Sequence, residues 1–67
     1  MRDWLKEKRN EKNLTMEIVA EKLGVSLGYY SMIENNIRQK KMDLAIATKL
    51  SAILDIPMSQ IIENEAQ

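Results

Sequence analysis

Residues 15–35 read TMEIVAEKLGVSLGYYSMIEN, and this stretch decides the fold of the chain. Three apolar residues in its first half are spaced so that they fall on one face of a helix: Val19, Ala20 and Leu23. Gly24 follows where a turn needs a residue in the left-handed region, and Ser26 then offers an N-cap for a second short helix. The stretch therefore predicts two helices, over residues 16–23 and 27–34, that are joined by a tight turn.

Close packing of these two helices depends on one small side chain. Ala20 lies four residues before Gly24, so the second helix can cross the first closely, and Val25 can fill the inside of the turn. Tyr30 and Ile33 are the apolar positions of the second helix that face the first. A bulky residue at Ala20 is expected to force the two helices apart.

Residues before this stretch predict a first helix over residues 2–12, because most of them are strong helix formers. Its apolar stripe is formed by Met1, Trp4, Leu5 and the aliphatic stem of Lys8. Asn13 can end this helix in the left-handed conformation, and Thr15 is a good N-cap for the next one.

Residues after the stretch predict two further helices. Asp43 can cap a helix over residues 44–54, which we expect at the centre of the core. Its apolar positions at helical spacing are Leu44, Ala47, Leu50, Ile53 and Leu54. Pro57 begins a last helix over residues 58–63, and residues 65–67 are expected to fray. Three residues are expected to direct this helix onto the others: Met58, Ile61 and Ile62.

No segment alternates with the period of a strand, and the sequence contains no internal repeat. The prediction is therefore an all-α fold in which five short helices form one domain over residues 1–67.

Composition excludes several classes of function. The 67 residues contain no cysteine and no histidine, so neither disulfides nor an ordinary zinc site is expected, and no cofactor is predicted. No glycine-rich phosphate loop and no converging set of acids and hydroxyls is present, so an enzyme is not expected. No signal-like apolar run and no membrane-length segment occurs, which predicts a cytoplasmic protein with no membrane partner.

Charge gives a local signal but no global one. Ten basic and ten acidic residues cancel, so net charge by itself does not propose nucleic acid as a partner. Arg38, Lys40 and Lys41 nevertheless form one clear basic run in residues 37–42, directly after the second helix of the central stretch. Such a run is either a solvated surface or a contact for phosphates, and its position favours the phosphates.

The order of these features resembles the lambda-repressor-like helix-turn-helix family, the Cro/C1 type that is also called the XRE family. The resemblance covers nearly the whole chain. It rests on LTMEIVAEKLGVS at residues 14–26, IEN at residues 33–35, Arg9 upstream, and LSAILDIPMSQII at residues 50–62. It implies a compact five-helix DNA-binding domain in which the second and third helices form the helix-turn-helix and the third helix enters the major groove.

By this resemblance, five residues at the start and on the outer face of the third helix would face the bases: Ser26, Leu27, Gly28, Ser31 and Met32. The sequence departs here from a strong reader of bases, because no Arg or Gln occurs on this helix and its first Asn is Asn35. Leu27 and Met32 could press on thymine methyl groups, which predicts weak direct readout. Gly28 admits two interpretations: close approach of a sugar-phosphate strand, or simple tolerance of glycine in a first turn.

The sequence offers better candidates for phosphate contacts than for base contacts. The resemblance assigns them to Thr15, Met16, Tyr29, Asn35, Arg38, Lys40 and Lys41. Family members usually carry Gln at position 16, so Met16 lacks the side-chain contact that the family makes there. The family also implies a structural salt bridge between Arg9 and Glu34, whereas the alternative is that both side chains are merely solvated.

Two functions remain open on this evidence. The first is a transcriptional regulator that binds double-stranded DNA, and we expect it to be a repressor. The second is a helix-turn-helix scaffold that binds a protein partner. Zero net charge favours it, and so does an apolar surface formed by Leu27, Gly28, Tyr29 and Met32 of the third helix with Met16 and Ile18 exposed nearby. A homodimer would use those residues of the last helix region that the core leaves exposed, and the candidates are Ile56, Met58, Ile61 and Ile62.

Overall fold

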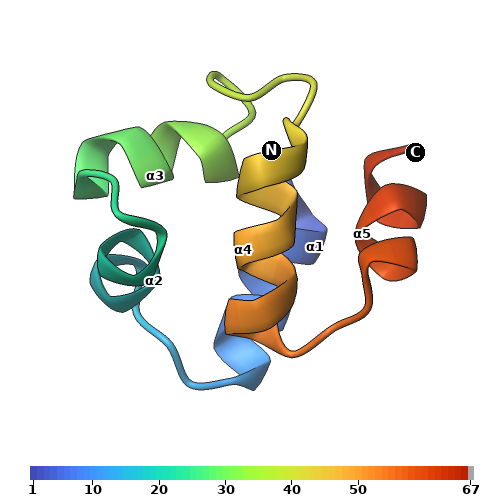
Figure 1. The fold of residues 1–67 in the computed structure, drawn as a ribbon. Coiled ribbons are helices and arrows are strands. Elements are labelled where there is room, and N and C mark those ends of the chain that lie inside the picture. Colours follow the sequence, from blue (N-terminus) through green and yellow to red (C-terminus); the bar gives the residue numbers. More distant parts are fainter. Residues whose placement is uncertain (67) are drawn as a thin grey trace.

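Helices α2 (Met16–Leu23) and α3 (Leu27–Glu34) meet at a tight turn, as the central stretch predicts (Figure 1). The computed structural model describes residues 1–66, and three further helices complete the fold: α1 (Asp3–Glu11), α4 (Leu44–Leu54) and α5 (Met58–Glu65). Because the described residues contain helices and no strands, the prediction of an all-α, five-helix fold of the lambda-repressor type is confirmed. Helix α4 lies between the α2–α3 pair and α5 (Figure 1).

Local capping rules explain where the helices begin and end. The Thr15 hydroxyl accepts a hydrogen bond from the Ile18 amide at 3.2 Å, and the Ser26 hydroxyl accepts one from the Tyr29 amide at 3.0 Å. Asp43 caps α4 in the same way. Gly24 ends α2 with φ +78°, a conformation that glycine adopts without steric cost.

The hydrophobic core lies between the five helices. Val19, Ala20 and Leu23 of α2 are buried together with Tyr30 and Ile33 of α3, as their helical spacing predicts. Helices α1, α4 and α5 add the remaining buried apolar residues, which are Leu5, Ala47, Leu50, Leu54 and Ile61. The expectation that α4 lies at the centre of the core therefore holds for its inner face.

Several apolar residues that were assigned to the core lie at the surface. Leu44 is 73% exposed because it is the first residue of α4, beyond the layer that α5 covers. Ile62 is 63% exposed and lines the open cleft between α4 and α5, so it does not direct that helix onto the bundle. Met1 is also exposed and does not extend the apolar stripe of α1.

The two ends of the chain also differ from the predicted helices. Helix α1 begins at Asp3, because the backbone and side chain of Arg2 turn inward to bind other segments. Helix α5 continues to Glu65, two residues beyond its predicted end, so Glu65 does not fray. Part of the predicted fraying, and the end of the predicted domain, fall on Gln67, which lies outside the described residues.

No helix within residues 1–66 is long and apolar enough to cross a membrane alone; only α4 and α5 taken together would reach that length and composition, and they are bent by 120°.

Candidate nucleic-acid interface

The exposed face of α3 carries the five residues that the resemblance assigns to bases. Ser26, Leu27, Gly28 and Met32 are exposed, and Ser31 is half-buried. The core-facing side of the same helix is formed by Tyr30, Ile33 and Glu34, which are buried. The five residues therefore lie at the N-cap and on the side of α3 opposite its core-facing residues. Part of their hydrogen-bonding capacity is already used, since the Ser26 hydroxyl caps the helix and Ser31 contacts the Asn35 amide.

Steric crowding within the described chain does not explain the glycine at position 28. A Cβ added at this residue would meet nothing within 4 Å, and its φ is not in the left-handed region. No crowding within the described chain therefore requires a glycine here. The two interpretations of Gly28, tolerance and close approach by an external strand, both remain compatible with this geometry.

The start of α2 differs in part from the sequence-based expectation. Thr15 is exposed and caps the helix, and its hydroxyl accepts from the Ile18 amide in the first turn of α2. Met16 is half-buried and packs against the core, rather than standing exposed at the surface. Ile18 is exposed, as predicted.

Residues 37–42, which we call the basic loop, leave α3 at the end distant from the α2–α3 turn (Figure 1). Arg38, Lys40 and Lys41 are all exposed on it, and none of them makes an ion pair within residues 1–66. These charges are therefore available to an external anion. At the root of the loop, the Asn35 side chain donates to the Ser31 carbonyl at 2.9 Å, so its amide is turned toward its own helix.

Gln39 joins the basic loop to the helices on either side. Its side-chain amide nitrogen donates to the Tyr29 hydroxyl at 3.0 Å, and its side-chain oxygen accepts from the Asp43 amide at 3.0 Å. Gln39 itself adopts φ +54°, a left-handed conformation that is costly for a non-glycine residue. Tyr29 is half-buried, and its hydroxyl accepts the hydrogen bond from Gln39, a contact that the sequence did not predict.

A buried ion pair joins α1 to the C-terminal end of α3. Arg9 Nε lies 3.1 Å from Glu34 Oε2 and Nη2 lies 3.2 Å from Oε1, which is the salt bridge that the resemblance implies. Arg9 also donates to the Leu14 carbonyl at 2.9 Å. The hydrogen bonds that Arg9 donates to the Glu34 carboxylate raise the pKa of Arg9. The pair thereby joins the end of α1 and the following turn to the end of α3.

The phenol of Tyr30 lies in the same environment as this pair. Its hydroxyl is buried and has no hydrogen-bond partner within residues 1–66. Burial raises the pKa of Tyr30, and the nearby Glu34 carboxylate raises it further, because both oppose formation of a phenolate. We call Arg9, Tyr30 and Glu34 the inner charge cluster.

A second buried arginine was missed by sequence analysis. Arg2 is 5% exposed, and its guanidinium binds Glu65 at 2.9 Å and the Ile33 carbonyl at 2.6 Å. A bidentate carboxylate pair between residues near the two ends of a sequence leaves no local signal. The ring nitrogen of Trp4 also donates to Glu65 at 2.9 Å, and helical periodicity did not predict this contact either.

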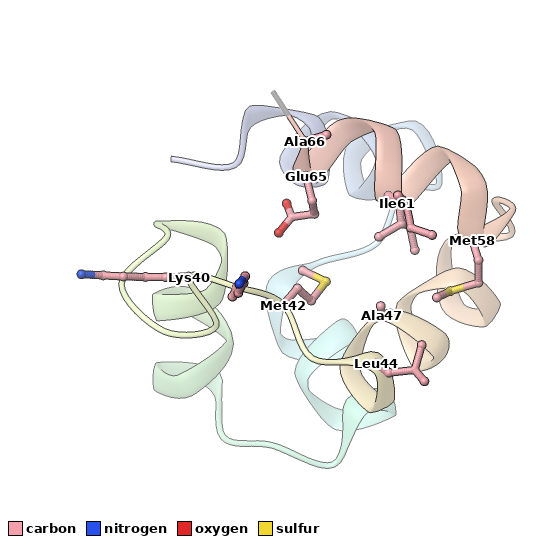
Figure 2. Close-up of a pocket in the computed structure, with 10 residues that line it drawn as sticks. Lys40, Met42, Leu44, Ala47, Met58, Ile61, Glu65 and Ala66 are labelled. Carbon is pink, nitrogen blue, oxygen red and sulfur yellow. The ribbon is translucent and has the colours of Figure 1, made fainter.

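A cleft of about 380 Å³ lies between the start of α4 and α5. Figure 2 shows Leu44 and Met58 on one side of it and Glu65 at the end nearest the basic loop. Of the four candidate dimer residues, Ile62 is exposed and Ile56 and Met58 are half-buried. Ile61 is 1% exposed, so it is a core residue and is not among the candidates that the core leaves exposed for a dimer surface.

No group of three or more acidic residues within positions 1–66 is arranged to hold a metal ion.

These features define a class of protein: a five-helix domain with a helix-turn-helix whose third helix and following loop are exposed. The family described as "Helix-turn-helix" matches residues 5–61. The chain belongs to this family, in its Cro/C1-type or XRE branch, and the resemblance inferred from the sequence is confirmed. The family is one of regulators rather than enzymes, in agreement with the expectation that the chain has no catalytic activity.

Curated relatives match the chain over part of their length. SinR, an HTH-type transcriptional regulator of Bacillus subtilis (strain 168), is 33% identical over 61 residues, which are 91% of this chain and 54% of SinR. SinR of Bacillus licheniformis matches to the same extent. An uncharacterised HTH-type transcriptional regulator of Bacillus subtilis (strain 168), YqaF, is 49% identical over 39 residues, 58% of this chain and 51% of YqaF. The chain thus spans about half the length of the curated relatives it matches.

Proposed function

We propose that this chain is a DNA-binding transcriptional regulator, acting as a repressor by occupying an operator, with α3 in the major groove. The observation that carries the proposal is the common exposure of three neighbouring elements. These are the outer face of α3, the basic loop that follows it, and the capped N-terminus of α2. Relatives that are named as transcriptional regulators support the same assignment.

Phosphate contacts supply most of the affinity in this proposal. Arg38, Lys40 and Lys41 approach one strand, and the first amides of α2 beside Thr15 hold a phosphate of the other. Each neutralised phosphate adds about 0.9 to the slope of log affinity against log salt, so the three basic side chains together contribute about 2 to 3. Zero net charge makes this local patch the main electrostatic attraction to DNA.

Base recognition on this surface depends little on side-chain hydrogen bonds. Leu27 and Met32 offer apolar contacts to thymine methyl groups, and the hydroxyl of Ser31 can donate or accept one hydrogen bond. Selectivity therefore rests on methyl contacts and on the shape and deformability of the operator.

A fluorescence anisotropy titration tests the proposal directly. The protein is titrated against a labelled generic duplex at several salt concentrations, and the bound sequences are then selected from a random pool. Binding that weakens steeply with salt and enriches a defined sequence supports the proposal. Failure to bind any duplex at low salt would contradict it.

A homodimer belongs to the same proposal, because one domain covers only a half-site. Two copies of α3 would have to lie about 34 Å apart to enter successive major grooves on one face of the duplex. The exposed Ile62 and the half-buried Ile56 and Met58 beside the cleft are the proposed contact. Sedimentation of the protein with and without a palindromic duplex distinguishes a dimer from a monomer. A regulator of this kind would act in the cytoplasm, where a bacterial operator is found.

The second candidate is a protein-binding module. Three large apolar residues are exposed on the α2–α3 pair, at Ile18, Leu27 and Met32, and their exposed fractions are 39%, 46% and 39%. Such a group can serve as a contact for another protein. This function would be favoured if the protein bound no duplex and if polar substitution at Leu27 abolished a protein complex without unfolding the domain.

A further inference from the structure

The guanidinium of Arg2 is the point at which three distant parts of the chain meet. Its Nη1 atom donates to the carbonyl of Ile33 at 2.6 Å and to that of Arg38 at 3.3 Å, and its Nη2 atom donates to the carbonyl of Gln39. On the opposite side, Nε and Nη2 bind the Glu65 carboxylate at 2.9 Å. The end of α3, the basic loop and the end of α5 are therefore held by one side chain.

Only an arginine side chain can make this set of contacts. The guanidinium carries five N–H donors in a rigid plane, so it binds a carboxylate through two of them and still reaches carbonyls with the others. Its charge is also favourable beside the carbonyl end of α3, where the helix dipole is negative. The backbone amide of Arg2 adds to this contact by donating to the Glu34 carbonyl at 2.8 Å.

The basic loop receives two of the Arg2 hydrogen bonds. Residues 37–42 belong to no helix, so their backbone geometry depends on such anchors and on the Gln39 bridge to Tyr29. The amides of Ile37 and Arg38 donate to the Met32 carbonyl at 2.8 and 3.1 Å, which fixes the start of the loop. Arg2 fixes the next two peptide groups, immediately before Lys40 and Lys41.

Glu65 is the one acidic side chain that binds Arg2 within residues 1–66. Its carboxylate accepts from Arg2 and from the ring nitrogen of Trp4, and its side chain is 22% exposed against 4% for Arg2. Because Glu65 is partly solvated, its removal should destabilise the fold less than removal of a fully buried acid. Glu65 is therefore the better residue to substitute.

We propose that Arg2 is a positioning residue for the basic loop and that Glu65 is its anchor. The inference rests on the proposed DNA-binding function and deepens it. Ordering one residue of a mobile loop costs about 1–2 kcal/mol of conformational entropy, so a loop that is already held presents Arg38, Lys40 and Lys41 to phosphates without that cost. Arg2 itself is buried and touches no nucleic acid.

Two variants that are matched in charge separate positioning from simple electrostatics. Glu65→Ala removes the anchor, and Glu63→Ala removes an exposed acid two residues earlier on the same helix. Both raise the net charge by one, which by itself strengthens DNA binding. Positioning predicts the opposite sign for Glu65→Ala alone, an affinity about tenfold weaker, as expected for loss of a charged hydrogen bond.

Hydrogen exchange in the free protein tests the positioning without DNA. The amides of Ile37 and Arg38 are the probes, and α2 amides report that the domain is still folded. In Glu65→Ala we expect these two amides to exchange about tenfold faster than in the wild type while α2 keeps its protection. Arg2→Lys, which keeps the charge but cannot bridge the same acceptors, should show the same change.

Each outcome decides the proposal. Faster loop exchange together with weaker binding in Glu65→Ala, but not in Glu63→Ala, supports it. Unchanged exchange of Ile37 and Arg38 overturns it, and so does a loosened loop that binds duplex as tightly as the wild type. If the wild type binds no duplex, the proposed function fails, and the exchange experiment still decides whether Arg2 holds the loop.

Discussion

Two buried arginines in the first nine residues differ in what their partners do. Arg9 pairs with Glu34 inside the domain, and both side chains are shielded from solvent. Arg2 pairs with Glu65 at the edge of the domain and spends its other donors on carbonyls of α3 and the basic loop. The first pair connects helices to one another, whereas the second connects a helix end to an exposed segment.

The difference teaches that burial of a charge and its functional effect are separate questions. An ion pair enclosed between helices affects the whole folding equilibrium, because breaking it leaves an uncompensated charge in the interior. A pair at the edge, with one partly solvated partner, affects mainly the local segment that it holds. The predictions below test this division, from the largest expected effect to the smallest.

Glu34→Ala should give the largest loss of stability. It leaves the Arg9 guanidinium buried without a carboxylate, and we expect the free energy of unfolding in urea to fall by about 3–5 kcal/mol. Lys12→Ala is the control, because it breaks an exposed pair with Asp55 at 3.7 Å that is worth about 0–1 kcal/mol. Equal losses in the two variants would remove the distinction between inner and outer pairs.

The second largest effect should be a loss of folding stability at alkaline pH, caused by Tyr30 of the inner charge cluster. Because the pKa of Tyr30 is raised in the folded protein, the folded state keeps a proton that the unfolded state loses above its ordinary pKa of about 10. Stability should therefore be unaffected by this group below pH 10 and fall by about 1.4 kcal/mol per pH unit above it. Urea unfolding at several pH values measures the decline.

Tyr30→Phe should abolish that decline, while Tyr29→Phe should keep it. At neutral pH Tyr30→Phe should change stability by less than about 1 kcal/mol, because the buried hydroxyl has no hydrogen-bond partner within residues 1–66 to lose. Persistence of the full decline in Tyr30→Phe would assign it to another group.

Lys40→Ala combined with Lys41→Ala tests the exposed side of the comparison. These side chains lie on the surface, so stability should change by less than about 0.5 kcal/mol. Affinity should fall for all duplexes alike, and the salt slope should flatten by about 2 units.

Met32→Ala is the matched test of base recognition, and it should change which sequences are selected from a random pool. If Met32→Ala and the double lysine variant weakened all sequences to the same extent, the assignment of the outer face of α3 to bases would be wrong.

Gly28→Ala should change stability only slightly, because Gly28 lies outside the Arg9–Glu34 and Arg2–Glu65 pairs. Since a Cβ there meets open space, thermal denaturation should show a gain of at most about 1 kcal/mol from helix propensity. The affinity for duplex then decides between the two interpretations of this glycine. A loss of binding despite higher stability indicates close approach of DNA, and unchanged binding indicates tolerance.

Most of the fold could be predicted because its signals are local. Caps at Thr15, Ser26 and Asp43 and the left-handed Gly24 depend on a few neighbouring residues, and their structures agree with the prediction. Helical spacing likewise identified Val19 and Leu23 as core residues. The Arg9–Glu34 pair was accessible only through resemblance to a family, since 25 residues separate the partners.

The remaining differences arise where position in space decides. Leu44 and Ile62 have the spacing of core residues, but no helix covers their side of α4 and α5 within the described chain. Arg2 was treated as an ordinary helix former because its role depends on carbonyls more than 30 residues away. The hydrogen bond that Gln39 donates to the Tyr29 hydroxyl was also not predicted, because it joins residues ten positions apart through a loop; the phosphate contact of Tyr29 stays a prediction.

The Arg2–Glu65 contact also has a consequence for the order of folding. Its partners are 63 residues apart, so it closes nearly the whole chain, and the entropy of such a closure is recovered only after the helices between have docked. We therefore expect this contact to be absent from the folding transition state, while the α2–α3 turn is already formed there. In stopped-flow experiments Glu65→Ala should accelerate unfolding and leave the refolding rate unchanged. The basic loop would then be the last part of the domain to take its shape and the first to lose it.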